Sequence, residues 1–384
     1  MPRDPASLAQ LVSIAAAEMP ADISGARDLR LRSNTLQVPG RWSRLLEHLL
    51  HLRSEAGNRY EPVTWQRVTL RAIASAPPLA LEVHARVLDE RGAQVPALAP
   101  PDLHRAGVAS TRVWTMLSAG EERVVTLPVY AALNEVAPGH YTRVIALHIP
   151  GEHQPFREQR YPLDVIAPQE APFLVTIATL LAAMLAATLA FLGRNAIFAS
   201  FSSRDLVLAA LVGATDFAIV TLPEIAFFNI VHALLGPLSV VLTGLLTGAV
   251  HYTLLACLLV LTPKRGMIAL VLVVRLLLAG IVMGQISLVA LLYASTNILL
   301  LEGALRVAPP RWLRDRRYLL AALLVAGAQG AAVLINFQVS KTLYRFYFAD
   351  WFVVLSVIVD GALYTWLGCC AGRRIGHGLL RVVG

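Results

Sequence analysis

The sequence contains very little lysine and cysteine. Lys264 and Lys341 are the only lysines among 33 basic residues, so arginine supplies almost all of the positive charge. The three cysteines, Cys257, Cys369 and Cys370, all lie in the C-terminal part of the chain. No disulfide framework can therefore stabilise the N-terminal part.

Sequence signatures of catalysis are missing as well. The chain has no GxxxxGK[ST], no HExxH and no GxSxG motif, and it has no heptad repeat. His48 and His51 share a helix face but have no obvious third ligand, so we expect no metal site. We predict that the protein is not an enzyme, that it needs no cofactor and that it has no ATPase of its own.

Apolar residues are abundant and unevenly distributed. They make up 56% of the 384 residues, and the mean hydropathy is +0.60, whereas soluble proteins contain about 45–50% apolar residues. Residues 1–168 have an ordinary soluble composition, and after them charged residues become rare. We predict an N-terminal soluble domain at 1–168, an extra transmembrane helix with a linker at 169–200, and a membrane domain at 201–384.

The membrane part contains seven apolar segments of about 20 residues, the length that crosses a bilayer. The predicted spans are Phe173–Leu192, Asp205–Leu222, Pro237–Leu261, Met267–Met283, Ile286–Leu305, Tyr318–Phe337 and Trp351–Gly368. Pro223 is expected to end the second span. The stretch from Pro223 to Leu235 is then an ordered external loop that dips into the bilayer or covers a site.

Positive charge lies in alternate gaps, after the first, third, fifth and seventh of these segments, and only Lys341 and Arg345 break the pattern. The positive-inside rule places these ends in the cytoplasm, which puts the N-terminal domain outside a bacterial inner membrane and the C-terminus inside. The rule also accounts for the net charge of +8 without nucleic acid. Because no secretory signal peptide is recognisable, we expect that the first span acts as a reverse anchor or that translation starts upstream of Met1.

The N-terminal domain has the pattern of a β-sandwich. Short β-branched or alternating segments are separated by turn signals such as Pro138-Gly139. The predicted strands are Val63–Ile73, Leu79–Leu88, Arg123–Tyr130, Tyr141–Ile149 and Tyr161–Ile166. Helices are predicted at Ala6–Ala17 and Trp42–Leu52.

Ionisable residues inside spans are functional candidates, because each is costly to bury in lipid. Asp216, Arg275 and Asp360 lie within the second, fourth and seventh spans. Arg275 either pairs with Asp216 or Asp360 as a structural bridge, or it contacts a charged ligand. His251, in the third span, is expected to be a neutral histidine packed between helices.

A second group of polar side chains lies at or below the predicted outer ends of the spans. A set of this kind suits a small polar ligand that enters from outside, but it is also what wet interfacial positions would show. Together with Asp216, the proposed ligand-binding residues are Glu224, Asn229, His232, Gln285, Tyr293, Asn297 and Asn336.

Small residues recur at every fourth position of the second span, at Ala210 and Ala214 in particular. Such spacing makes a flat face that another helix can approach closely. Similar pairs occur at Gly244/Gly248 and at Gly327/Ala331.

The order of these features resembles the substrate-binding S components of energy-coupling factor (ECF) transporters, especially the thiamine-precursor branch. The resemblance covers about residues 204–372, and it rests on the small-residue span, Gly236-Pro237, the Pro263–Gly266 turn, Gly284-Gln285 and Leu299–Glu302. The turn Pro263-Lys264-Arg265-Gly266 departs from the Lys-Pro-Gly order of that branch. The N-terminal domain and the first span have no counterpart there.

The resemblance implies a six-helix S-component fold plus one extra N-terminal transmembrane helix. It implies binding of a vitamin or cofactor precursor near the outer face. It also implies docking of Ala210 and Ala214 onto a membrane T component that two cytoplasmic ATPases drive. Two alternatives stay open: a membrane-anchored extracytoplasmic sensing or docking protein, and a polytopic membrane enzyme that uses Asp216, His232 and Asp360.

Overall fold

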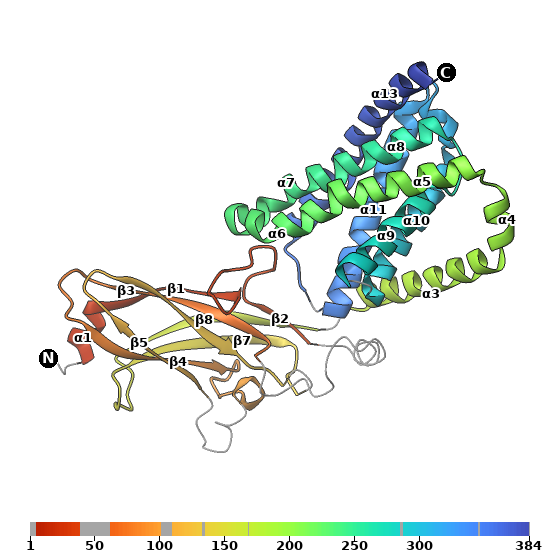
Figure 1. The fold of residues 1–384 in the computed structure, drawn as a ribbon. Coiled ribbons are helices and arrows are strands. Elements are labelled where there is room, and N and C mark those ends of the chain that lie inside the picture. Colours follow the sequence, from red (N-terminus) through yellow and green to blue (C-terminus); the bar gives the residue numbers. More distant parts are fainter. Residues whose placement is uncertain are drawn as a thin grey trace. The chain divides into compact units, whose positions relative to one another are not determined.

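The computed structural model describes residues 5–38, 62–100, 110–132, 135–167, 169–284, 287–344 and 346–383. The chain forms two compact units (Figure 1). The first contains Met1–Gln169 together with Leu343–Ala349, and the second contains Glu170–Thr342 together with Asp350–Gly384. The first is rich in strands and the second is helical.

The first unit is built from two β-sheets. One has the strand order β1-β3-β6 and the other has the order β2-β8-β7-β4-β5. Apolar side chains of both sheets, such as Leu70, Leu127, Val83 and Ile145, share one buried cluster. The bounds are α1 (Pro5–Leu11), β1 (Val12–Ala21), β2 (Thr35–Gln37), β3 (Thr64–Ala72), β4 (Leu79–Leu88), η1 (Pro96–Leu98), β5 (Thr111–Leu117), β6 (Glu122–Val129), β7 (Gly139–His148) and β8 (Arg157–Ile166).

The connectivity of this sandwich is that of immunoglobulin-like domains. The chain leaves the first sheet after β1 and enters the second as β2, which pairs in parallel with β8. The hydroxyl of Tyr141, near the start of β7, donates to the carbonyl of Ala137 at 2.7 Å. This bond is the tyrosine corner of such sandwiches, here in a domain without cysteine.

The helix predicted at Ala6–Ala17 is wrong in its second half. Helix α1 ends at Leu11, and Val12 begins a strand that pairs antiparallel with β3. The side chains of Val12, Ile14, Ala17 and Met19 are buried. Core packing on that face outweighs the helix propensity of an alanine-rich segment. The helix predicted at Trp42–Leu52 lies outside the described residues.

The interior of the sandwich contains a buried arginine. Antibody domains of this architecture have a disulfide between the two sheets instead. Arg143 on β7 is 2% exposed, and its guanidinium donates to Gln66 Oε1 at 3.1 Å and to Asn34 Oδ1 at 2.5 Å. Burial lowers the pKa of Arg143 to about 10, so the side chain stays protonated at neutral pH. Gln66 belongs to β3, so this polar contact connects the two sheets.

Two stacked histidines on the other face of the larger sheet predict a pH dependence. The rings of His84 and His148 lie 4.0 Å apart, and burial, as the largest cause, lowers both pKa values below 6.5. The unfolded chain then binds protons that the folded sheet excludes. Stability should therefore fall as the pH drops below about 6.5.

Hydrogen–deuterium exchange of β4 and β7 peptides in the intact protein at pH 5.5 and 7.5 measures this effect. His148→Gln should reduce the loss of protection at pH 5.5. The matched control is His153→Gln, an exposed histidine in the β7–β8 loop, which should behave like the wild type. Equal protection of the wild type at the two pH values would contradict the prediction.

The second unit is a bundle of long apolar helices. Within the described residues, six helical segments are long and apolar enough to cross a membrane, and α9 is a shorter apolar helix. The protein is therefore a multi-pass membrane protein. The bounds are α3 (Glu170–Leu192), α4 (Arg194–Ala199), α5 (Ser203–Asp216), η3 (Phe217–Thr221), α6 (Leu222–Leu235), η4 (Gly236–Leu238), α7 (Ser239–Gly244), η5 (Leu245–Val250), α8 (His251–Leu261), α9 (Met267–Met283), α10 (Leu288–Val307), η6 (Pro310–Leu313), α11 (Tyr318–Tyr344), α12 (Asp350–Leu355), η7 (Ser356–Tyr364) and α13 (Thr365–Val383).

The external loop predicted at Pro223–Leu235 is wrong, because this stretch is helix α6. Proline has no N–H for the helix ladder, and its ring crowds the preceding turn. That turn is the π-helix η3, where Leu222 N donates five residues back to Phe217 O. The wider turn accommodates Pro223, and residues 203–235 continue as one helical rod about 50 Å long at 1.5 Å per residue.

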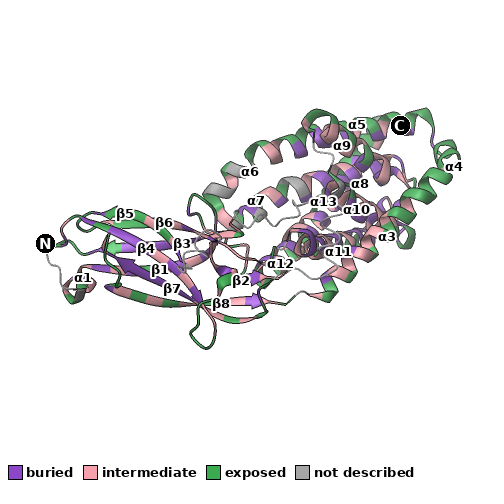
Figure 2. Cartoon of the chain, turned by 90° about the horizontal axis from the view of Figure 1, so that it is seen from below, coloured by how far each residue is buried: buried purple, intermediate pink, exposed green. Residues whose placement is uncertain are grey.

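Burial differs strongly between the helices (Figure 2). Helix α3 is exposed along most of its apolar length, with Leu181, Met184 and Leu185 each more than half exposed. Helix α8 lies at the centre, where Leu255, Leu258 and Leu259 belong to the main apolar cluster. Lipid is the natural environment of the exposed apolar positions.

The segment between α11 and α12 pairs with the β-sandwich, and this limits how many times the chain can cross a membrane. Within the first unit, Arg32 N donates to Tyr347 O at 2.8 Å, and Ala349 N donates to Arg30 O at 2.8 Å. Residues 346–349 therefore lie on the same side of a membrane as the β-sandwich. The chain must then cross an even number of times between Gln169 and Leu343. Five of the six long apolar segments lie in that stretch, so an even number needs one further crossing. Helix α9 is the apolar helix left for it among the described residues, and its 17 residues are at the lower limit of what a bilayer needs.

Candidate functional site

A polar cluster lies inside the helical bundle and centres on Asp216. This residue is fully buried at the end of α5. Its Oδ1 lies 2.8 Å from His251 Nδ1, and its Oδ2 lies 3.3 Å from an Nη of Arg275. The site thus joins α5, α8 and α9, which the sequence separates by up to 59 residues.

Arg275 also contacts the last residue of the π-helical segment η3. Its Nε donates to Thr221 Oγ1 at 2.9 Å, and the same Nη that faces Asp216 lies 3.3 Å from His251 Nδ1. A carboxylate at Asp216 favours the tautomer in which His251 Nδ1 donates to it. The sequence left open whether Arg275 pairs with Asp216 or with Asp360. In the structure, Arg275 pairs with Asp216.

Asp360 lies elsewhere in the bundle, against a glycine face. A Cβ added to Gly244 would lie 2.7 Å from Asp360 Oδ1, and one added to Gly248 would lie 3.2 Å from the Asp360 carbonyl. The predicted small-residue pair at Gly244 and Gly248 therefore packs against η7 within the same chain.

Each of the three polar positions Asp216, His251 and Asp360 adjoins a π-helical segment. Asp216 immediately precedes η3, His251 immediately follows η5, and Asp360 lies inside η7. Such segments occur frequently at functional sites, because the wider turn shifts the register of the helix ladder. The sequence gives no direct signal for π-helical turns. The ionisable residues next to them could be found in the sequence, but the turns themselves could not.

A second polar group joins α10 and α11. Tyr293 Oη and Ser340 Oγ lie 2.6 Å apart. Asn297 is one turn from Tyr293 on α10, and Asn336 is one turn from Ser340 on α11, so all four face the same seam. Ser340 was not among the predicted site residues, since a serine at the end of an apolar span carries little signal.

Two of the predicted residues carry a buried oxygen without a hydrogen-bond partner among the described residues, Oδ1 of Asn297 and Oδ1 of Asn336. Oδ2 of Asp216 also forms no hydrogen bond, but it faces Arg275 as an ion pair at 3.3 Å. A buried acceptor without a donor costs about 1–3 kcal/mol, so such positions call for a further partner. Ser356 Oγ and Thr365 Oγ1, which the sequence did not single out, have the same property.

Of the remaining predicted ligand residues, the structure describes the side chain of Glu224. Glu224 lies in the first turn of α6 and interacts electrostatically with Arg275 and Asp216. The side chains of Asn229 and His232, and Gln285 as a whole, lie outside the described residues. Among the described residues, no hydrogen bond or ion pair joins the Asp216 cluster to the Tyr293 group.

The small-residue span presents two different faces. Ala209 and Gly213 are buried, and a Cβ at Gly213 would lie 2.8 Å from Val274 of α9. Ala210 and Ala214, the predicted docking residues, are exposed. One row thus packs inside the chain, and the other is open to lipid or to another protein.

The turn Pro263–Gly266 holds the ends of three helices together. Lys264 Nζ lies 2.6 Å from Asp205, which is in the first turn of α5. The carboxylate of Glu302 on α10 accepts from the backbone N–H groups of Gly266 at 3.0 Å and Ala269 at 3.3 Å. Glu302 thus caps the start of α9.

The Asp216 cluster combines a carboxylate, an imidazole and a guanidinium in a buried environment. It can hold a small polar molecule by charge-assisted hydrogen bonds, and it can exchange a proton between Asp216 and His251. Among the described residues, no group of three or more His, Cys, Asp or Glu side chains is arranged to hold a metal ion.

No protein-family model matches the chain, and no curated protein shows significant similarity to it.

Proposed function

We propose that the helical unit is the membrane substrate-binding subunit of an ECF-type importer for a vitamin or cofactor precursor. In this proposal α5 to α13 form the binding bundle, and α3 and the β-sandwich are additions. The protein is not itself an enzyme. A T component and two cytoplasmic ATPases supply the energy, and the β-sandwich lies outside the inner membrane.

The observation that carries the proposal is the set of buried acceptors without donors. Asn297 and Asn336 were selected from the sequence as ligand contacts, and the Oδ1 atom of each is buried without a hydrogen-bond partner among the described residues. Asp216, also selected, has a buried Oδ2 whose contact is the ion pair with Arg275. A small polar molecule with N–H or O–H groups would satisfy the two asparagine oxygens. The open face of α5 at Ala210 and Ala214 supports the second part of the proposal, docking to another membrane protein.

The first test is a pull-down of the tagged full chain from native membranes in mild detergent, followed by mass spectrometry of proteins and small molecules. Co-purification of two ATPases and a T-like membrane protein would support the importer, and a retained small molecule would identify its cargo. If the chain is recovered alone with no small molecule, the proposal fails.

Bulky side chains on the open face of α5 should abolish docking. Ala210→Leu/Ala214→Leu should reduce the recovered T-like protein about tenfold or more, because close helix contact depends on small residues. The matched control is Gly327→Leu/Ala331→Leu on α11, a pair with the same spacing that is also exposed. Equal recovery with both double variants would show that α5 is not the docking helix.

A second candidate function is favoured by the edge of the larger sheet. On β5, Trp114 is 64% and Met116 is 60% exposed, which is unusual for large apolar side chains of a sandwich. In this alternative the sandwich docks an envelope protein and the helices anchor it. The same pull-down distinguishes the two, since only envelope proteins would then be recovered.

A further inference from the structure

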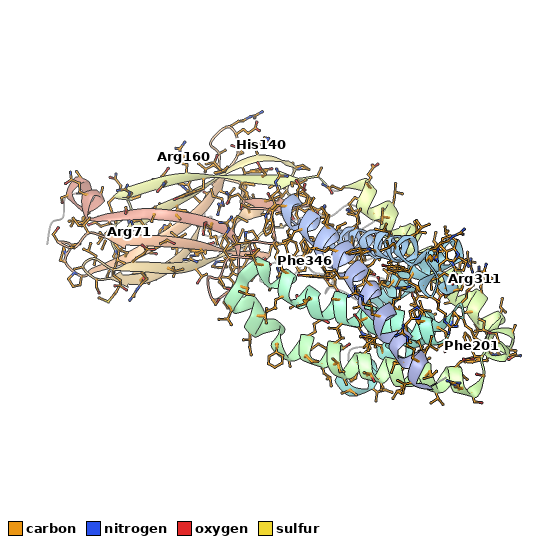
Figure 3. The ribbon with its side chains drawn as sticks, turned by 90° about the horizontal axis from the view of Figure 1, so that it is seen from above. Arg71, His140, Arg160, Phe201, Arg311 and Phe346 are labelled. Atoms are coloured by element: carbon orange, nitrogen blue, oxygen red, sulfur yellow. The ribbon has the colours of Figure 1, made fainter. Side chains whose placement is uncertain are left out.

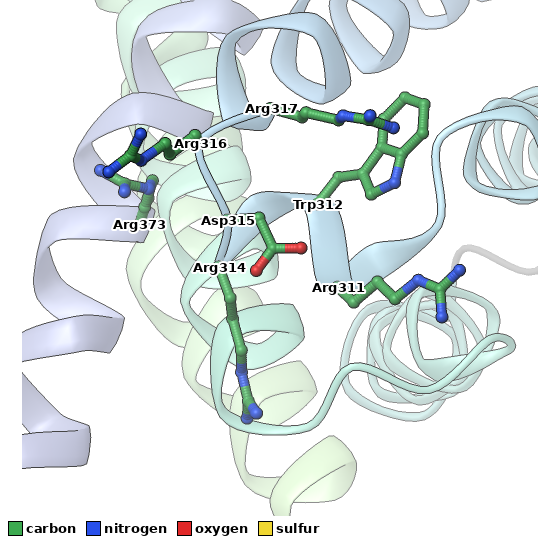
Figure 4. Close-up of a pocket in the computed structure, with 7 residues that line it drawn as sticks. All are labelled: Arg311, Trp312, Arg314, Asp315, Arg316, Arg317 and Arg373. Atoms are coloured by element: carbon green, nitrogen blue, oxygen red, sulfur yellow. The ribbon is translucent and has the colours of Figure 1, made fainter.

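A basic pocket lies at the end of the helical unit that carries the start of α5 and the α10–α11 connection. Arg311 and Phe201 mark this end in Figure 3. The pocket has a volume of about 620 Å³ and is lined by residues of η6, of the loop that leads to α11, and of α13. Five of its seven lining residues are arginines, and one is an acid, Asp315 (Figure 4).

Two of the arginines build the pocket. Arg314 donates to the carbonyls of Val260 and Leu261, the latter at 2.8 Å, and so closes the C-terminal end of α8. Arg373 on α13 donates to Leu313 O at 3.1 Å, and its guanidinium lies 4.0 Å from the ring centre of Tyr318. These contacts connect α8, η6 and α13, so the pocket walls have a fixed geometry.

The other three arginines are available for a ligand. The guanidinium of Arg317 lies 5.3 Å from the ring centre of Trp312. Arg311 and Arg316 are exposed, and the side chain of neither forms a hydrogen bond or an ion pair with a described residue. Asp315 likewise has no ion pair with a described residue, so it does not neutralise them. Figure 4 shows the ends of Arg316 and Arg373 together on one side of the pocket and the end of Arg311 on the opposite side.

We propose that this pocket binds a phosphate-bearing anion, with Arg316 as the principal ligand beside Arg373 and with Arg311 as a second contact on the opposite side. The planar guanidinium presents paired N–H groups that match phosphate oxygens, and several guanidiniums around one pocket repel each other until an anion is bound. The pocket lies where the helices end, which is the level of lipid headgroups, and basic pockets between helix ends bind acidic phospholipids. A free phosphate compound offers the same chemistry. The inference is independent of the proposed importer function.

The test compares phosphatidylglycerol, phosphatidylcholine and inorganic phosphate as probes of the purified full chain in detergent. Native mass spectrometry measures bound lipid, and thermal unfolding measures stabilisation by each probe. Arg311→Gln/Arg316→Gln removes the two free arginines. The charge-matched control is Arg204→Gln/Arg381→Gln, which removes two exposed arginines outside the pocket.

We expect the wild type to prefer phosphatidylglycerol over phosphatidylcholine. The pocket variant should bind it about tenfold more weakly, and the control should stay within about twofold of the wild type. Stabilisation by phosphate but not by the lipid, again lost only in the pocket variant, would identify a soluble phosphate compound as the ligand. Equal losses in both variants would show diffuse surface charge instead, and no preference of the wild type for either phosphate-bearing anion would also overturn the proposal.

Discussion

Asp216→Asn is expected to destabilise the helical unit strongly and to abolish ligand retention. The change leaves the side-chain shape almost unaltered, but it removes the charge that faces Arg275 at 3.3 Å. Removing one partner of a buried pair costs about 3–5 kcal/mol, because the other charge stays buried without compensation. For a unit of this size, that corresponds to a fall in Tm of about 10 °C.

A double variant separates the structural role of this pair from its role in binding. Asp216→Asn/Arg275→Gln removes both charges, so it should recover much of the lost thermal stability. Under the proposed function, it should still retain no small molecule in the pull-down. Asp350→Asn, which changes an exposed acid in the first turn of α12, is the control.

Two results would contradict this interpretation of the cluster. If the double variant is as unstable as the sum of the two single variants, the charges of Asp216 and Arg275 do not compensate each other. If Asp216→Asn retains the small molecule at wild-type level, Asp216 is not part of the binding site.

Gly372→Leu is expected to prevent normal assembly of the bundle. Gly368, Gly372 and Gly376 form a row on α13 that packs directly on α8. A Cβ at Gly372 would lie 2.3 Å from Thr253 O and 2.9 Å from Cys257 N, and both are backbone atoms of the facing helix. Neither can move without separating the two helices, so the whole seam loses its packing.

The same helix offers a matched control in Gly378. No atom lies within 4 Å of a Cβ added there, so Gly378→Leu changes helix propensity without a clash. Leucine favours a helix over glycine by about 0.8 kcal/mol, and the control should keep or raise the Tm. We expect Gly372→Leu to lower the Tm by about 10 °C or more, or to elute as aggregate on size-exclusion chromatography. An unchanged elution profile and Tm would show that α8 and α13 do not pack as described.

The elements with a strong local pattern could be predicted from the sequence. The strand predicted at Leu79–Leu88 has these bounds in the structure, because its core-facing apolar residues alternate with polar ones. The apolar helices could be predicted as well, since hydropathy over about 20 residues is a strong signal. The ends of these helices were less predictable. A proline such as Pro223 normally indicates the end of a helix, and only the structure shows that the π-helical turn before it lets the helix continue.

Features that depend on a distant partner could not be predicted. Strand β1 has an alanine-rich sequence, and only its pairing with β3 makes it a strand. The function of the glycine row on α13 depends on the backbone of α8, which is more than 100 residues away in the sequence. In the candidate site, the charged residues of the spans could be identified from the sequence, because burying a charge in lipid costs free energy. Thr221 and Ser340 are ordinary residue types for a span and are recognised only by their contacts.

The short segment Leu343–Ala349 gives the β-sandwich a second connection to the chain of the helical unit, made by backbone hydrogen bonds rather than by a covalent link. The sandwich joins the helical unit through Gln169, which leads into α3, and again through residues 343 and 349, which lead from α11 and into α12. Any displacement of α11 or α12 would pull on the backbone pairing at residues 30–32.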